Sequence, residues 1–316
     1  MDSQLEGSVT TVTANRYAGA CKTCGRTVPA EAGELRKQAE AWVVYHVECL
    51  PAPSPGWHTG LLGSFDTETT GTDPFAARLV SAAFVTSAGG RREFLVDPGV
   101  EIPAEATAVH GISTEQARTL GARPQAALDE IAALLAGHLA AGAPLIVFNA
   151  PFDLTLLEAE LARHGLEPLG RRAGAIRPVV DPLLIDRTLD KYRKGSRTLE
   201  AQCAHYGVTI KNAHDACADA VAAMEVAKAQ AAKFSELAEA SLADLHDRQV
   251  VWSEASERDY AAYRARRGES HTPQVGWPVR VKTAAAAAVP GQPSERDRVS
   301  TKDSSGVTAP PGTATL

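Results

Sequence analysis

The chain of 316 residues contains no run of eighteen or more apolar residues, so it offers no candidate membrane-spanning helix. Its first residues, MDSQLEGSVT, lack the basic and apolar regions of a secretory signal peptide. It also lacks internal repeats and an excess of positive charge, since the formal net charge is -6. This charge argues against a uniformly basic nucleic-acid coat, although a local basic strip would not show in the total. We expect a soluble, cytoplasmic protein that makes no membrane contact.

Cysteine is scarce and odd in number, with five in the chain and three of them within the first fifty residues. This distribution suits metal ligation in a reducing compartment better than a disulfide framework. The segment CKTCG supplies Cys21 and Cys24, and HVEC supplies His46 and Cys49. Each pair brings two ligands onto one turn, and two such turns can close a tetrahedron around one structural Zn²⁺.

A zinc ion would also explain how so short a segment becomes ordered, because it has too little core to fold alone. The alternatives are a redox CxxC motif and chance clustering. A thioredoxin-type motif should open a helix in a βαβ unit, and it needs no second His/Cys pair. The sequence therefore favours zinc. It leaves three tasks open for the module: nucleic-acid contact, partner docking or simple stapling of the segment.

Composition divides the chain into six parts. The prolines of PAPSPG, at residues 51–56, interrupt helix and strand alike, and the tail is rich in Pro, Ser, Thr and Gly. The expected parts are a flexible N-terminus 1–16, a zinc-binding module 17–50, a linker 51–59, an α/β domain 60–234, a helical extension 235–282 and a disordered tail 283–316.

The α/β domain alternates short apolar strands with segments of helical periodicity. Three strands in succession, followed by strands alternating with helices, describe a mixed α/β sheet. The strands are expected at 61–65, 79–86, 92–96, 145–148 and 178–180. Helices are expected at 126–141, 154–164, 198–206 and 215–234, and Ser113 with Gln116 forms a capping-box pattern that opens a further short helix.

Two carboxylates stand two residues apart in FDTETTG, where Asp66 and Glu68 would share one face of a strand. They follow the apolar run LLGSF, so we expect them to be buried. A buried like-charged pair costs several kcal/mol unless a cation or a proton intervenes. The pair therefore predicts a cation site.

Two further carboxylates occur where α/β sheets build their sites, at strand ends and helix starts. Asp153 follows the strand LIVF, and Asp219 lies with His214 in NAHDACADA at the start of the last helix of the domain. Any one of these acids could be a surface charge or a helix cap. These alternatives are less convincing when the four acids are considered together.

Four segments, SFDTETTG, AVHGIS, VFNAPFDLTLL and AHDACADA, resemble in this order the DnaQ-like exonucleases of the DEDDh type. That family includes the proofreading epsilon subunit of bacterial DNA polymerase III, RNase T and the oligoribonucleases. The resemblance covers residues 60 to about 233. It implies an RNase H-like fold that removes nucleotides from a 3′ end with two divalent ions.

The resemblance also implies roles. Asp66, Glu68 and Asp219 would hold the first ion, and Asp66 would bridge to the second. Asp153 would act on the second ion largely through water, and His214 would be the general base. Independently, carboxylates suit Mg²⁺ or Mn²⁺, and two such ions about 4 Å apart can stabilise both the attacking and the leaving oxygen. A histidine can take the proton from the water.

The spacing of the last motif favours the histidine subtype, because His214 stands five residues before Asp219. In the tyrosine subtype a Tyr stands four residues before the last Asp, and that position is Asp215 here. Asp215 as the metal ligand is the competing register. The residue five before it is Ile210, which cannot serve as a base.

Further residues are candidates for substrate contact. By the same resemblance, the pocket for the terminal nucleotide would be lined by Thr69, His110, Asn149 and Phe152. An aromatic or imidazole face can stack on a base without reading its identity. Core packing is the alternative for Phe152, and a turn position is the alternative for His110.

The strip RTLDKYRKGSR, residues 187–197, carries five basic residues against one acid, a net charge of +4. It could hold the phosphates of an incoming strand, and a solvated loop is the alternative. The candidate contacts in it are Lys191, Arg193, Lys194 and Arg197.

The expected function is a metal-dependent 3′–5′ exonuclease that releases nucleoside monophosphates from single-stranded or frayed DNA, in repair or proofreading. One alternative is an RNA-trimming exoribonuclease on the same site, and another is a non-catalytic adaptor. The chain has no polymerase motif, so proofreading would require a partner such as a DNA polymerase.

Overall fold

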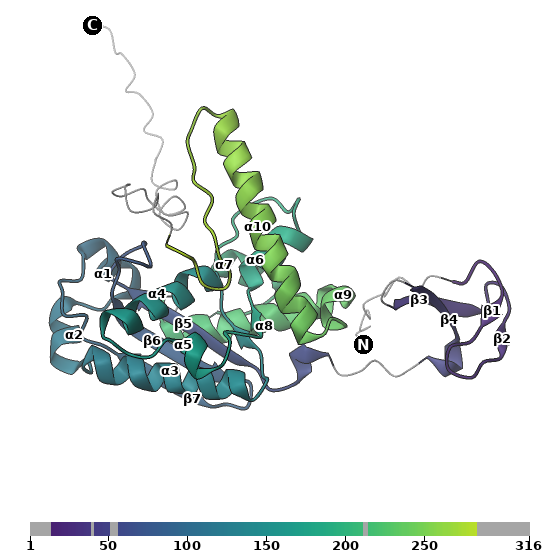
Figure 1. The fold of residues 1–316 in the computed structure, drawn as a ribbon, viewed down its shortest axis with the longest axis horizontal. Helices are drawn as coiled ribbons and strands as arrows, with labels where there is room; N and C mark the ends of the chain where they lie inside the picture. The colour runs from purple at the N-terminus through teal and green to yellow at the C-terminus, as the bar shows by residue number, and fades with distance from the viewer. Residues whose placement is uncertain (1–13, 39–40, 51–55, 211–213, 283–316) are drawn as a thin grey trace, which may run out of the picture. The chain divides into compact units, whose positions relative to one another are not determined.

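The computed structural model describes residues 14–38, 41–50, 56–210 and 214–282 (Figure 1). Two compact units divide the chain, Met1–Gly56 and Trp57–Leu316. The expected disordered tail 283–316, most of the expected flexible N-terminus and residues 51–55 of the expected linker lie outside the described residues. Residues 57–59, which the sequence placed in the linker, belong to the second unit.

The first unit is built from two antiparallel ribbons. Strand β1 (Gly19–Ala20) pairs with β2 (Thr27–Val28), and β3 (Gly33–Gln38) pairs with β4 (Ala41–His46), which leads into the short 3-10 turn η1 (Val47–Cys49). Among the described residues of this unit, the buried apolar cluster consists of three side chains, Cys21, Val28 and Tyr45. So small a core supplies little hydrophobic stabilisation.

The second unit contains a five-stranded sheet in the order β7-β6-β5-β8-β9. Neighbouring pairs among β5, β6 and β7 are antiparallel, whereas β8 and β9 run parallel to β5. The strands are β5 (Gly63–Thr69), β6 (Leu79–Thr86), β7 (Arg91–Leu95), β8 (Leu145–Ile146) and β9 (Val179–Val180). The expected mixed α/β fold, an RNase H-like sheet flanked by helices, is confirmed.

Helices connect and cover these strands. The first group comprises η2 (Trp57–Thr59), α1 (Ala104–His110), α2 (Thr114–Leu120), α3 (Pro124–Ala140), α4 (Ala150–Arg163) and α5 (Leu169–Arg172). The second comprises α6 (Pro182–Leu189), α7 (Leu199–Tyr206), α8 (Ala216–Lys233), α9 (Ser235–Ala238) and α10 (Leu242–Arg266). As expected, Ser113 caps α2 by accepting a hydrogen bond from the N–H of Gln116. No helix among the described residues is both long and apolar enough to cross a bilayer.

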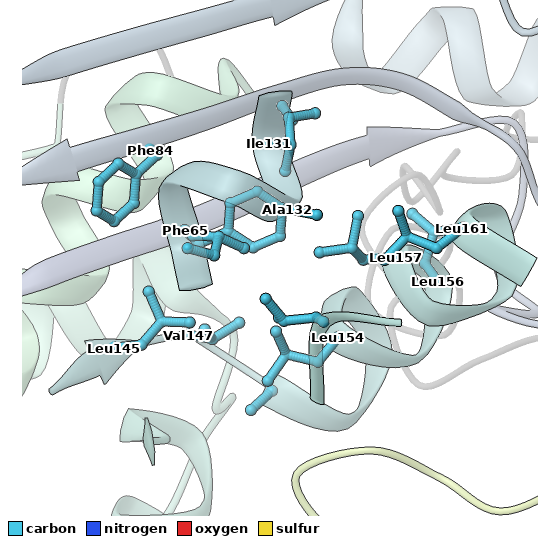
Figure 2. Close-up of a cluster of buried hydrophobic side chains, with 14 of the residues drawn as sticks. Phe65, Phe84, Ile131, Ala132, Leu145, Val147, Leu154, Leu156, Leu157 and Leu161 are labelled. Carbon is cyan, nitrogen blue, oxygen red and sulfur yellow. The ribbon is translucent and has the colours of Figure 1, made fainter. Parts of the chain in front are cut away.

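Both faces of the sheet are buried. Successive residues of a strand point to opposite faces, and Leu145 joins one apolar cluster whereas Ile146 joins another. The first cluster packs Phe65 of β5 against side chains of α3 and α4 such as Ile131 and Leu154 (Figure 2). The second cluster joins Ile146 to residues of α7 and α8. Helices therefore pack on both faces of the sheet and hold the ends of its strands in place.

The start of β5 requires glycine. A Cβ at Gly63 would lie 2.5 Å from Nε2 of His138 and 2.7 Å from Cε2 of Phe84. His138 is buried there, with Nε2 3.0 Å from the carbonyl of Pro144. A structural role for His138 follows from this packing.

The helical extension covers the edge strand β9. His246 of α10 accepts a hydrogen bond from the N–H of Val179 through Nδ1, and Gln249 donates to the carbonyl of the same residue. These side chains take the place of a neighbouring strand and satisfy the exposed edge. The segment after α10 returns to the core, where Trp277 is buried with its ring 4.9 Å from that of His246.

Candidate active site

Three carboxylates converge from two elements. Asp66 and Glu68 come from one face of β5, and Asp219 comes from the first turn of α8. Their carboxylate oxygens lie within 4.8 Å of one another. The side chains are nearly buried, with exposed fractions of 6%, 8% and 9%. Three acids this close repel one another in a poorly solvated site, and their oxygen donors are those that hard divalent cations prefer. The group therefore fits a Mg²⁺ or Mn²⁺ site.

Asp153 lies on the other side of β5. It sits in the first turn of α4, is fully buried, and accepts a 2.6 Å hydrogen bond from the hydroxyl of Thr67. Because Thr67 alternates with Asp66 and Glu68 along the strand, it links Asp153 to the site from the opposite face. Asp153 does not belong to the group of three.

The local structure before α8 separates the two possible registers of the last motif. Asp215 is the N-cap of α8, and its side chain accepts a hydrogen bond of 2.9 Å from the N–H of Ala218. The structure brings Asp219, not Asp215, to the three-carboxylate group. The backbone N–H of His214 donates to Oδ2 of Asp219 at 3.2 Å, so the loop before the helix also orients this acid.

The ring of His214 lies at the rim of the site. Its side chain is 49% exposed, and Nε2 is 3.6 Å from Oε1 of Glu200 on α7. The backbone has a φ of 68°, in the left-handed region that non-glycine residues rarely adopt. His214 is thus next to the carboxylates through its backbone, while its imidazole pairs with an exposed acid.

His110 ends α1, and its Nδ1 accepts a hydrogen bond from the N–H of Ile112. Burial lowers its pKa; a hydrogen bond with the backbone of Thr69 opposes this shift, and the nearby charge of His214 adds to it. This electrostatic contact indicates that the two histidines and Thr69 lie near each other. Because Nδ1 is the acceptor, a neutral His110 carries its proton on Nε2, which is the nitrogen that can donate a hydrogen bond to a nucleotide.

Asn149 and Phe152 lie where β8 leads into α4. Asn149 is in the left-handed conformation, with a φ of 63°, and its N–H donates to Oδ1 of Asp181 at 3.0 Å. Phe152 is 7% exposed. Such burial is what core packing predicts for this ring.

Two of the expected phosphate contacts have partners inside the protein. Arg193 and Arg197 both pair with Asp186 of α6, whose side chain is completely buried. Tyr206 also donates to this carboxylate. The two guanidinium groups therefore neutralise an internal acid and hold the loop after α6. In the same loop Lys191 and Lys194 are exposed, and they remain candidates for contact with a nucleic-acid backbone.

Sequence reasoning missed Asp181, which organises this edge of the sheet. Its carboxylate accepts hydrogen bonds from the N–H groups of Asn149, Ala150, Leu183 and Leu184. Burial raises its pKa, and these donors oppose the shift. It caps α6 and ties the end of β8 to the end of β9. An acid directly before Pro182 and an apolar run is a helix-start signal that could have revealed it.

The Cys3His group of the first unit also converges. One ligand atom from each of Cys21, Cys24, His46 and Cys49 lies within 4.8 Å of the others. Nδ1 of His46 is 3.5 Å from the sulfur of Cys24, and Nε2 is 3.1 Å from the carbonyl of Thr27. An Nε2–H that donates to this carbonyl leaves Nδ1 as the ligand, as in structural zinc sites.

The thiols of this group cannot all ionise by themselves. The pKa of Cys21 falls to about 6, because hydrogen bonds from Cys24, His46 and Thr23 outweigh the upward effect of burial. Burial and the two neighbouring sulfurs raise the pKa of Cys49 to about 11. A divalent cation would relieve this repulsion, so the donor set fits Zn²⁺.

The comparisons with known proteins agree with this geometry. The model of the Exonuclease family (RNase_T) matches residues 64–227. A DNA polymerase III subunit epsilon-like protein of Rhodobacter capsulatus is 35% identical over 170 residues, which are 51% of this chain and 22% of that protein. The chain thus spans about a fifth of this curated relative.

Among solved structures, E. coli Exonuclease I in complex with a dA16 oligonucleotide matches with a TM-score of 0.50 and 22% identity. The zinc-bound form of the E. coli Exonuclease I complex with single-stranded DNA matches with a TM-score of 0.50 and 23% identity. Each match covers 56% of this chain and 42% of the other, and at this identity it shows the fold. Since the family model spans half of the sequence, the chain belongs to the RNase_T exonuclease family.

Proposed function

We propose that the protein is a metal-dependent 3′–5′ exonuclease that hydrolyses the terminal phosphodiester of single-stranded or frayed DNA and releases nucleoside monophosphates. The observation that carries this proposal is the set of three nearly buried carboxylates, Asp66, Glu68 and Asp219, within 4.8 Å of one another. Family membership supports it. The proposed exonuclease domain is 60–234, joined to a zinc module at 17–50.

Each residue of the site has a defined task in this reaction. Two divalent ions would lower the pKa of the attacking water and stabilise charge on the leaving oxygen. Asp66, Glu68 and Asp219 would hold them, and Asp153, oriented by Thr67, would act through water. His214 takes the proton of the attacking water, for which its ring must turn from Glu200 toward the carboxylates.

The residues next to the carboxylates are suited to contact the 3′ end of a nucleic-acid strand. Thr69, His110 and Asn149 offer hydrogen-bonding groups at the same edge of the sheet, without an array that would read one base. DNA is the preferred substrate in this proposal because the relatives named above are an epsilon-like protein and an exonuclease bound to DNA oligonucleotides. Association with a DNA polymerase, in the cytoplasm, is part of the same proposal.

The test uses single-stranded DNA and RNA of one sequence, labelled at the 5′ or the 3′ end, with Mg²⁺, Mn²⁺ or EDTA. We expect a 5′-labelled DNA ladder that shortens from the 3′ end only with metal, and that is absent for Asp66→Asn. Faster digestion of RNA would replace the DNA assignment by the exoribonuclease. If neither strand is cut by the folded protein, the catalytic proposal is wrong.

A further inference from the structure

A cavity of the second unit lies where four parts of the chain meet. It is lined by Asn149 and Pro151 at the start of α4, by Arg187 of α6, by Glu257 of α10 and by Arg280 of the C-terminal segment. Arg280 lies outside residues 64–227, the part of the chain that matches the exonuclease family. The exonuclease core and the extension therefore build this cavity together.

The cavity lies at the same edge of the sheet as the three carboxylates. Strands β5, β8 and β9 are parallel, so their carboxyl ends meet at one edge. Asp66 and Glu68 occupy this end of β5, Asn149 follows β8, and α6 follows β9. Neighbouring strands are about 4.8 Å apart, which places the cavity about 5–10 Å along the edge from β5. A strand whose 3′ end lies at the carboxylates and that runs along this edge toward β9 would pass the cavity with its next phosphates.

The C-terminal segment packs against α4. The N–H of Arg280 donates a 2.8 Å hydrogen bond to Oγ1 of Thr155, which stands two residues after Asp153 on α4. Trp277 is buried in the main core cluster. These contacts hold the backbone of Arg280 next to α4.

The charges of the cavity are arranged to receive an anion. Its two acids are already engaged with donors: Asp181 accepts four backbone N–H groups, and Glu257 accepts hydrogen bonds from His271 and from the N–H of Gln274. The guanidinium of Arg280 forms no ion pair with the residues that the structure describes. Burial lowers its pKa, and the charges of Glu257 and Asp73 oppose this shift. Arginine stays charged in proteins, so a partly buried guanidinium whose nearby acids form no direct ion pair with it can still bind a phosphate.

We propose that Arg280 binds a backbone phosphate of the substrate strand upstream of the bond that is cut. This inference rests on the proposed function, because it takes the nucleic-acid strand as the ligand. It gives the C-terminal segment a direct part in substrate binding.

A measurement of DNA binding tests this inference independently of catalysis. We would measure the anisotropy of 5′-labelled single-stranded DNA with the full chain carrying Asp66→Asn, in Mg²⁺ and at several salt concentrations. In this background, Arg280→Ala should weaken binding about tenfold and reduce the slope of log K against log salt by about one. Arg280→Lys should keep the slope and recover part of the affinity.

The matched control is Arg171→Ala. Arg171 is an exposed arginine on α5, which follows α4 at the far end from the carboxylates, and its loss should change neither quantity. An unchanged salt slope for Arg280→Ala, or a lowered melting temperature that Arg280→Lys does not restore, would overturn the inference by assigning Arg280 a structural role.

Neutral linkages locate the contact. Methylphosphonate at one linkage at a time removes one phosphate charge, and the chain with Arg280 should lose affinity at one upstream position where Arg280→Ala loses none. Equal sensitivity of both at every position would overturn the inference. So would binding of millimolar inorganic phosphate that depends on Arg280 and leaves DNA binding intact, because the cavity would then hold free phosphate. If the wild-type chain cuts no oligonucleotide, the proposed activity is wrong. The binding measurements with the Arg280 variants would still test the phosphate contact, because they do not depend on cleavage.

Discussion

At the scale of single residues, Asp215 and Asp219 look alike in the sequence and differ in the structure. Asp219 belongs to the carboxylate group, whereas Asp215 caps α8. Asp219→Asn should lower kcat by about three orders of magnitude, because it would remove one of the proposed metal ligands on which charge stabilisation would depend. Asp215→Asn should retain activity, because asparagine caps a helix as well as aspartate does. Steady-state hydrolysis of a labelled oligonucleotide measures both.

The outcome that would contradict this assignment is the reverse ranking, with Asp215→Asn inactive and Asp219→Asn active. Circular dichroism and thermal melting of both variants provide the control for folding. The two substitutions remove the same charge from neighbouring turns, so a general electrostatic effect cannot imitate the difference.

At this scale, the sequence predicted only those contacts that follow from the spacing of residues within one element. The spacing of two between Asp66 and Glu68 predicts a shared strand face, because strands alternate. The pairing of Arg193 and Arg197 with Asp186 could not be predicted in this way. Their partner lies in the apolar helix α6, and local composition does not show which cation meets which buried acid.

At the scale of elements, the contact of α10 with β9 depends on a neutral histidine. Nδ1 of His246 accepts the N–H of Val179, and an accepting nitrogen must be unprotonated. Burial lowers the pKa of His246, the charge of Arg177 lowers it further, and Asp247 opposes the shift. The full stability of this contact is therefore present above the unfolded pKa of about 6.5 and is lost as pH falls toward the folded pKa.

His246→Asn keeps an acceptor without the titration. We expect the difference in unfolding free energy between the wild type and this variant to shrink as pH falls from about 7.5 to 5, measured by urea denaturation. A difference that stays constant over this range would show that His246 titrates alike in the folded and unfolded chain. The comparison cancels the other histidines, which both proteins share.

The ribbons of the first unit should depend on metal. Their apolar cluster has three members, so most of the ordering free energy must come from the Cys3His group. We expect about one zinc per chain by elemental analysis. Cys21→Ser should lose this zinc and leave the hydrolysis of short oligonucleotides unchanged. Cys203→Ser, which alters a buried thiol of the second unit, should keep the zinc.

Sequence periodicity did not predict several of the short helices. The five strands and the helices α3, α4, α7 and α8 were expected within a few residues, because an apolar run marks each strand and each of these helices repeats its apolar pattern over at least two turns. Helix α6 has eight residues and was missed. Its capping acid, Asp181, marks the start of this helix in the sequence. The other hydrogen-bond donors to Asp181, at the end of β8, come close to it only in the folded sheet.

At the scale of the whole molecule, the two units have separate cores, and the border between them decides which truncation is tolerated. Trp57, at the start of the second unit, packs on clusters that include Val226 and Met224 of α8. Its indole N–H donates a 2.8 Å hydrogen bond to the carbonyl of Leu237. The second unit thus begins before the exonuclease motifs and uses this ring as its first anchor.

A chain that begins at Gly56 should therefore keep the melting temperature of the second unit and its kcat on short oligonucleotides. A chain that begins at Gly60 lacks Trp57 and should lose about 2 kcal/mol, the cost of exposing a half-buried aromatic side chain and breaking its hydrogen bond. Urea unfolding of both truncations, with Trp57→Ala in the full chain as the matched control, measures this difference. Equal stability of the two truncations would mean that Trp57 is dispensable and that the folded unit begins at β5.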